Sequence, residues 1–229
     1  MLSIIVPVLD EAGVIAAHLA ALGPMRAAGA EAIVVDGGSR DGTAGIAAPY
    51  ADRVLLAPRG RASQMNAGAR AAAGDLFLFL HADTRLPPRA DALIAAALAA
   101  GGRVWGRFDV RIEGRAAVLP LIAMLMNWRS RMTGIATGDQ AIFVTRDAFR
   151  AVGGYPEIPL MEDIVLSRRL KRLTMPVCLA EPVTTSGRRW DERGAARTIW
   201  TMWRLRLAFA LGADPHRLAG AYGYRARDD

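Results

Sequence analysis

The first hundred residues alternate two kinds of segment, and this alternation constrains the fold more than any other feature. Short runs rich in Val, Ile, Leu and Phe are separated by longer Ala-rich segments with a helical period. The runs expected as strands are residues 2–8, 31–35, 53–57 and 75–80, and the segments expected as helices are residues 11–29, 41–51, 61–74 and 88–100. Regular strand–helix alternation predicts an α/β fold with a mostly parallel central sheet flanked by helices.

The rest of the chain is less regular. We expect strands at residues 103–113 and 138–145, an extended segment at 175–186, and helices at 116–132, 162–173 and 195–211. No internal repeat or low-complexity linker divides the sequence. Because 52% of the 229 residues are hydrophobic, the chain can bury a full core, and we expect a single domain.

The charge balance limits the class of partner. A net charge of +7 and an isoelectric point near 10.6 imply an anionic partner, such as a phosphorylated ligand, a nucleic acid or an acidic membrane. The basic residues are scattered, and no nucleic-acid-binding motif is present, so we expect no nucleic-acid partner. A lone cysteine, Cys178, excludes a disulfide framework and a cysteine zinc site, and it agrees with a reducing cytoplasm. The first residues lack the basic start and apolar stretch of a signal peptide.

Acidic residues follow three of the predicted strands. Asp10 and Glu11 follow the first strand, Asp36 follows the second, and Asp83 follows the fourth. Ligands of parallel α/β sheets bind outside the carboxyl ends of the strands, so we expect these acids to meet in one crevice. For any one of them, a plain turn is the alternative explanation, because Asp favours turns.

These acids lie in segments that resemble a known family. The sequences SIIVPVLDE (3–11), VVDGGSRDGT (34–43) and FLHADT (79–84) resemble the signature segments of family-2 glycosyltransferases, which have the GT-A fold. Within that family the chain is most similar to a small bacterial branch, the radical-SAM/selenodomain-associated transferases. The resemblance implies that the first half of the chain binds a nucleotide-diphospho-sugar donor, with a UDP-sugar favoured. The residues implied for nucleotide binding are Pro7, Leu9, Glu11, Asp36, Gly37, Arg59, Gly60, Gln64 and His81.

The family's D-x-D segment, which holds the divalent metal and the sugar diphosphate, corresponds to residues 81–83. By resemblance Asp83 binds Mg²⁺ or Mn²⁺, whereas His81 stands in place of the first acid. One carboxylate can suffice, because these cations take further oxygen ligands from water and from the phosphates. His81 either hydrogen-bonds the ribose or is a packed residue.

A pair of acids, Glu162 and Asp163, begins the helix predicted at 162–173. Acids in a first helical turn stabilise the helix dipole by about 0.3–1 kcal/mol, which is a purely structural explanation. The resemblance implies another role, because an E-D pair here is the catalytic motif of the family. It makes Asp163 the general base, while Glu162 orients the acceptor or the helix.

Two further segments are candidates for contacts with the acceptor or the diphosphate. Asp139 and Gln140 precede the catalytic pair, and a hairpin role is their alternative. Arg188, Arg189 and Trp190 form the second segment. The two arginines are suited to a diphosphate, because guanidinium matches phosphate geometry, and a solvated basic loop is the alternative.

The second segment partly resembles the Q-x-x-R-W segment of processive family members. The final Arg-Trp is present, but Ser186 stands in place of the glutamine, so processive synthesis is not expected.

The helix expected at 195–211 mixes large apolar residues with three arginines. It either packs on the core or lies on an anionic membrane, and the second alternative favours a lipid-linked acceptor. The longest apolar run, Ala116–Met126, is well short of the ~20 residues that a membrane span needs. We therefore expect a cytoplasmic protein, with peripheral contact at the inner face of the membrane through 195–211 as the open alternative.

The prediction is a metal-dependent, inverting glycosyltransferase with an unknown acceptor. We divide its single domain into a nucleotide-binding half (1–102), an acceptor and catalytic half (103–190), and a C-terminal helix and tail (191–229). One alternative is a sugar-phosphate nucleotidylyltransferase, although the loop after the first strand lacks the basic, Gly-rich sequence that such enzymes use. The other is a non-catalytic nucleotide-binding or membrane-peripheral protein. This alternative stays open because His81 replaces the first acid of the D-x-D segment. A Walker loop is excluded because Lys171 is the only lysine, and no dinucleotide fingerprint or nucleophile elbow is present.

Overall fold

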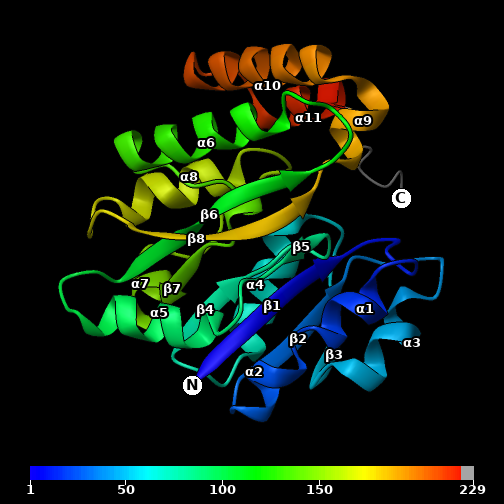
Figure 1. Ribbon diagram of the computed structural model, residues 1–229, viewed down its shortest axis with the longest axis vertical. Coiled ribbons are helices and arrows are strands. Elements are labelled where there is room, and N and C mark those ends of the chain that lie inside the picture. The colour runs from blue at the N-terminus through cyan, green and yellow to red at the C-terminus, as the bar shows by residue number, and fades with distance from the viewer. Residues whose placement is uncertain (223–229) are drawn as a thin grey trace.

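The structure is a computed structural model that describes residues 1–222 of the chain (Figure 1). Within these residues, eight strands form one sheet with the order β3-β2-β1-β4-β7-β6-β8-β5. The strands are β1 (Leu2–Val8), β2 (Glu31–Asp36), β3 (Arg53–Leu56), β4 (Leu76–Phe79), β5 (Thr84–Arg85), β6 (Trp105–Glu113), β7 (Phe143–Thr145) and β8 (Val177–Ser186).

The pairing divides the sheet into two parts. Strands β3, β2, β1 and β4 are parallel, as the alternation in the sequence predicts. In the second part β7 is antiparallel to both β4 and β6, β6 and β8 are parallel, and β5 is antiparallel to β8. The sheet as a whole is therefore mixed. Because β7 runs opposite to β4, the segment that enters β7 lies at the edge where β4 ends.

Helices cover both faces of the sheet, which gives three layers (Figure 1). The helices are α1 (Ile15–Ala20), α2 (Gly23–Ala27), α3 (Thr43–Ala47), α4 (Arg61–Ala71), α5 (Ala90–Ala99), α6 (Leu119–Thr133), α7 (Arg146–Ala151), α8 (Glu162–Leu170), α9 (Arg188–Arg193), α10 (Ala195–Ala210) and α11 (Pro215–Tyr222), with 3₁₀ turns η1 (Ala48–Tyr50) and η2 (Gly138–Gln140). Strand β1 sends Ile4 and Val6 into one buried cluster and Ile5 into the other, as the two-residue period of a strand requires. The first cluster includes Leu19 of α1, and the second includes Met65 of α4.

Four short or late elements were not predicted: β5, α7, α9 and α11. The strand predicted at 138–145 is wrong in its first part, because residues 138–140 form the turn η2 and only Phe143–Thr145 pairs in the sheet. The left-handed backbone of Ala141, with φ of 47°, separates the two. The last predicted helix is confirmed as α10. Residues 223–229 of the predicted tail lie outside the described residues.

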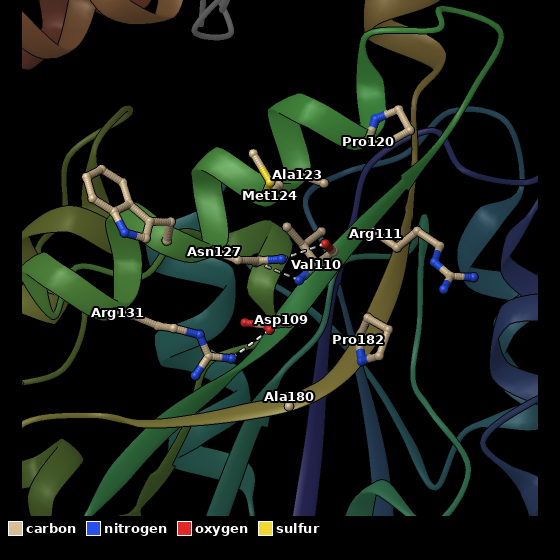
Figure 2. Close-up of a pocket in the computed structure, with 11 residues that line it drawn as sticks. Asp109, Val110, Arg111, Pro120, Ala123, Met124, Asn127, Arg131, Ala180 and Pro182 are labelled. Carbon is tan, nitrogen blue, oxygen red and sulfur yellow. Dashed lines mark hydrogen bonds and ion pairs between the residues drawn. The ribbon is translucent and has the colours of Figure 1, made fainter.

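Helix α6 is joined to β6 by a buried polar network. Arg107 of β6 is fully buried; its guanidinium pairs with Asp109 and donates to the Ser130 hydroxyl at 3.1 Å and to the Asn127 carbonyl at 3.1 Å. Asp109 also pairs with Arg131 of α6 at 2.6 Å, and the Asn127 amide bonds the backbone of β6 (Figure 2). Buried charges are costly unless paired, so this network fixes α6 on the sheet.

Candidate active site

The loops after β1 and β2 are tied together by their own polar groups. The Asp10 N–H donates to Ser39 Oγ at 2.9 Å, and the Arg40 N–H donates back to Asp10 Oδ1 at 2.8 Å. The Glu11 N–H donates to Thr43 Oγ1 at 2.9 Å. These reciprocal bonds make the two loops one unit at the carboxyl edge of the sheet.

Asp36 is held at that edge in a fixed orientation. It is level with Val8 in the β1–β2 register, and its side chain is 4% exposed. Its Oδ1 accepts two hydrogen bonds from Ser39, from the N–H at 2.9 Å and from the hydroxyl at 2.6 Å. A carboxylate fixed in this way is preorganised for a ligand, and its contact with a nucleoside stays a prediction.

Gln64 does not have the role that the sequence suggested. Its Nε2 donates to the carbonyls of Val8 and Val35, both at 2.8 Å, so both amide hydrogens are engaged within the protein. Its side chain lies against Gly37, where an added Cβ would be 3.1 Å from the Gln64 amide. Gln64 therefore holds β1 and β2 together beneath the loops and does not offer its donors to a nucleotide.

Glu11 links the first half of the chain to α9. Arg188 Nη2 lies 3.7 Å from Glu11 Oε1. Burial raises the pKa of Glu11, Arg188 opposes this shift, and the negative charge of Asp83 adds to it. Asp83 and Arg188 therefore both lie close to Glu11, and residues more than 100 positions apart meet at one site. Trp190 is half-buried and packs against the core, and its contact with a ligand stays a prediction.

His81 lies against the turn η2. Its Nδ1 is 3.5 Å from Asp139 Oδ1, and a Cβ added to Gly138 would lie 2.5 Å from the imidazole. Burial raises the pKa of Asp139, but His81, Arg61 and Arg189 outweigh it, so the net pKa is lowered. His81 is thus a packed residue with a carboxylate partner, and a bond to the ribose stays a prediction.

The same turn contacts the acid pair Glu162–Asp163 at the start of α8. The Gly138 N–H donates to Asp163 Oδ2 at 3.0 Å, and the Ile164 N–H donates to Oδ1 at 2.7 Å. Met161, immediately before the pair, has a left-handed backbone with φ of 69°, a strained conformation for a residue with a side chain. Burial raises the pKa of Asp163, and these donors oppose the shift.

Glu162 is enclosed more deeply than its neighbour. It is 4% exposed, and its Oε1 lies 3.7 Å from Arg61 Nη1 at the start of α4. Burial raises its pKa to about 7, against the opposing charge of Arg61 and with a contribution from Asp163. Helix-dipole stabilisation alone does not require such burial.

Gln140 is also part of the support of this site. It is fully buried; its Oε1 accepts from the Thr137 N–H at 3.2 Å, and its Nε2 donates to Asn127 Oδ1 at 3.3 Å. It therefore holds η2 against α6, where the sequence suggested a ligand contact. The contacts predicted for Pro7, Leu9, Arg59 and Gly60 stay predictions.

Arg129, which lies on α6, was not among the residues predicted for the site. Its Nε and Nη2 are buried with no hydrogen-bond partner in the part of the chain that the structure describes. Burial lowers its pKa, and the charge of Asp163 opposes this shift. A guanidinium that is desolvated beside the catalytic pair is available to an anionic ligand group. Nothing in the helical period of residues 116–132 distinguishes it from a surface arginine.

The residues at the site fit a metal that is shared with a ligand. Among residues 1–222, no three His, Cys, Asp or Glu side chains are grouped so that they could hold a cation by themselves. Mg²⁺ and Mn²⁺ commonly use one or two carboxylates and complete their shell with phosphate and water oxygens. Asp83 is half-buried and its charge reaches Glu11, which is compatible with that second kind of site.

Comparison with known proteins agrees with this geometry. The model of the family described as Glycosyl transferase family 2 matches residues 3–152, well over half of the chain. No curated protein matches the chain.

Several solved structures share the fold. TarS 1–349 of S. aureus in complex with UDP is 17% identical with a TM-score of 0.65, and the match covers 81% of this chain and 60% of that one. The mannosyltransferase PcManGT from Pyrobaculum calidifontis, in complex with GDP-Man and Mn²⁺, is 22% identical with a TM-score of 0.62 over 90% of this chain and 60% of that one. Glucosyl-3-phosphoglycerate synthase from Mycobacterium tuberculosis, in complex with Mg²⁺ and UDP, is 20% identical with a TM-score of 0.60 over 81% of this chain and 70% of that one.

The chain thus spans less than two thirds of the length of the first two. At these identities the structural similarity establishes only the fold, which is GT-A. Membership of the family is established by the match to the family model. The chain therefore belongs to glycosyl transferase family 2, a family of glycosyltransferases, as its signature segments implied.

Proposed function

We propose that the protein transfers a sugar from a nucleotide-diphosphate donor, preferably a UDP-sugar, to an acceptor hydroxyl with inversion at the anomeric carbon. One observation carries the proposal. The turn η2 touches His81 of the metal-binding segment on one side and donates a hydrogen bond to Asp163 on the other. A donor held beside Asp83 and an acceptor held beside Asp163 would therefore meet at this turn.

In the proposed site, Asp36 and Glu11 hold the nucleoside and Asp83 holds Mg²⁺ or Mn²⁺. When bound, the cation would neutralise the negative charge of the departing diphosphate. Arg188, which lies 3.7 Å from Glu11, and Arg189, whose charge reaches Asp139, supply further positive charge on the same side. A diphosphate is a good leaving group only when its negative charge is compensated. In the proposed site the two arginines and the divalent cation would supply that compensation.

Asp163 acts as the general base. As the acceptor oxygen bonds to the anomeric carbon, the bond from that carbon to the diphosphate oxygen breaks, and its electron pair leaves with the nucleotide. The acceptor proton passes to the Asp163 carboxylate, which the Gly138 and Ile164 N–H groups hold in place. A base with a raised pKa accepts a proton more readily, provided that it is ionised at the working pH. Glu162 lies beside Arg61, whose charge opposes the rise in the pKa of this buried carboxyl.

The acceptor is proposed to be lipid-linked. This assignment rests on α10, where large apolar side chains and arginines share one helix, and on Arg129, which offers a desolvated cation to an anionic acceptor group.

The function can be tested by calorimetry and donor hydrolysis. We expect UDP to bind the wild-type protein more tightly with Mn²⁺ than without it. Asp83→Ala should abolish this gain in UDP affinity. Asp75→Ala, which removes an exposed carboxylate just before β4, is the matched control and should bind normally. Asp163→Asn should bind UDP normally and hydrolyse the UDP-sugar about 10²–10⁴ times more slowly, the usual contribution of a general base.

Two outcomes would contradict the proposal. Absence of UDP and GDP binding with Mn²⁺ or Mg²⁺ would favour a non-catalytic protein. Full hydrolysis and transfer by Asp163→Asn would show that another group accepts the proton.

A further inference from the structure

Helix α6 exposes a continuous apolar stripe to solvent. Each member lies three or four residues from another member, so they lie on one side of the helix. They are Leu121, Met124, Leu125, Trp128 and Met132. The buried side of α6 holds Leu119, Ile122, Ala123 and Ser130. A surface helix normally turns its polar side to water, and α6 is apolar on both sides.

Helix α10 has the same unusual character. Its exposed large side chains are Trp200, Trp203 and Leu207, and Leu211 follows at its C-terminus. Trp200 is 69% exposed and Trp203 is 74% exposed, values that are unusual for the largest apolar side chain. Among the side chains of residues 1–220 that the structure describes, the two helices and this last leucine hold nine of the sixteen large hydrophobic ones that are exposed.

Both helices lie at one end of the long axis of the molecule (Figure 1). The Ile199 side chain of α10 packs against the core cluster that contains Leu119 and Ile122 of α6. We call the exposed sides of α6 and α10 together the α6–α10 face. Exposed apolar area on this scale marks an interaction site.

The charges of these helices point to the partner. Neither helix contains an acidic residue, and Arg197 and Arg204 of α10 are exposed. Of the other arginines, Arg131 pairs with Asp109 of β6, and Arg129 and Arg206 have buried guanidinium nitrogens. An apolar face with tryptophans and exposed arginines is complementary to a bilayer that contains anionic lipids. A second copy of the chain fits less well, because a two-fold contact would place this positive surface against itself.

A groove beside α6 extends the face toward the sheet (Figure 2). It encloses about 520 Å³ between α6 and strands β6 and β8, with Met124, Ala180 and Pro182 among its apolar walls and Arg111 and Arg131 among its polar ones. Figure 2 shows the Arg131 guanidinium directed to Asp109 at the lower side of this space. Asp109 also lines the groove and compensates the charge of Arg131, so the groove adds apolar walls and the Arg111 guanidinium to the face.

From these observations we infer that the α6–α10 face binds the surface of an anionic lipid bilayer, with α6 and α10 lying in the interface. No helix in the described part of the chain is both long and apolar enough to cross a bilayer. The inference extends the proposed function by naming the surface on which a lipid-linked acceptor would be met. It also adds α6 to the predicted membrane contact, which the sequence analysis limited to residues 195–211.

Vesicle co-sedimentation tests the inference. The full chain should sediment with vesicles of equal parts phosphatidylcholine and phosphatidylglycerol, and much less with pure phosphatidylcholine. Binding should weaken at least tenfold in Trp128→Ser/Trp203→Ser, which removes one exposed anchor from each helix. Leu56→Ser is the matched control, because Leu56 is 79% exposed on β3 and should leave binding unchanged.

A second pair of variants tests the charge. Arg197→Gln/Arg204→Gln should reduce binding to the anionic vesicles in 0.1 M salt and have little effect in 1 M salt, where charges are screened. Light scattering of each protein gives its mass in solution.

Several results would overturn the inference. The first is that the wild-type protein does not bind anionic vesicles. The second is that Trp128→Ser/Trp203→Ser binds them as well as wild type does. The third is that the wild-type protein forms a stable dimer that this double variant dissociates. UDP binding without vesicles, measured on the same proteins, separates this test from that of the proposed function. Loss of vesicle binding with normal UDP binding would reject only the membrane inference, and the reverse would reject only the catalytic proposal.

Discussion

Replacing Glu162 with glutamine should make the protein more stable at alkaline pH. Glu162 is almost fully buried, and burial raises its pKa from 4.5 to about 7. Between these two values the folded protein holds a proton that the unfolded chain has released. The free energy of unfolding therefore falls as pH rises through this window.

The size of the effect follows from the shift. Each pKa unit corresponds to 1.36 kcal/mol, so a shift from 4.5 to about 7 costs about 3 kcal/mol once the carboxyl is ionised. Glutamine is nearly isosteric with the protonated carboxyl and cannot ionise. Glu162→Gln should therefore be more stable than wild type by about 3 kcal/mol at pH 8 and differ little from it near pH 4.5.

Urea unfolding at pH 4.5, 6, 7 and 8 measures this difference, with a constant m-value as the check for two-state behaviour. Glu181→Gln is the matched control, because Glu181 is exposed on β8 and should give a difference near zero at every pH. A stability difference that does not change with pH, or a variant less stable at pH 8, would refute the reasoning. Glu162→Gln should also lose activity. A buried carboxyl that lowers the free energy of unfolding when it ionises is expected to be retained because it serves the reaction.

Three further predictions concern residues that support the site. Gly138→Ala should lower transfer or hydrolysis at least tenfold with little change in the urea midpoint, because its Cβ would lie 2.5 Å from the His81 imidazole at the end of a loop. Gly68→Ala should reduce the free energy of unfolding by about 1–3 kcal/mol, measured in urea, because its Cβ would overlap Ile5 in the core. Gln64→Met should reduce it by about 2 kcal/mol and weaken UDP binding in calorimetry, because two strand carbonyls at the edge lose their donors; unchanged UDP affinity would show that the edge does not depend on this amide.

The first half of the fold was predictable because its signals are local. A parallel strand that is buried on both faces is a continuous apolar run, and Asp36 and Asp83 follow such runs directly. Their common edge follows from the parallel register, so the gathering of acids at that edge could be predicted before any contact was known.

The second half depends on long-range pairing, which local patterns do not encode. The reversal of β7, set by its contacts with β4 and β6, brings Asp139 to His81. The position of α9 likewise brings Arg188 to Glu11 across the sheet. The sequence identified these residues as candidates but could not distinguish a ligand contact from an internal one. For this reason Gln64 and Gln140 were assigned to ligands, although their amides bond within the protein.

Helix α6 joins the two proposals physically. Its outer side carries Trp128 in the α6–α10 face, whereas Arg129 on the same helix is half-buried, with Nε and Nη2 buried, and lies within reach of the charge of Asp163. Asn127, the residue before them, accepts the hydrogen bond from Gln140 that holds the turn η2. An α-helix with its side chains is about 10–12 Å across, so the bilayer surface and the catalytic base would be separated by roughly one helix. An acceptor with its tail in the membrane would then need only a short polar head to reach Asp163, and an anionic group in that head would pass Arg129 on the way.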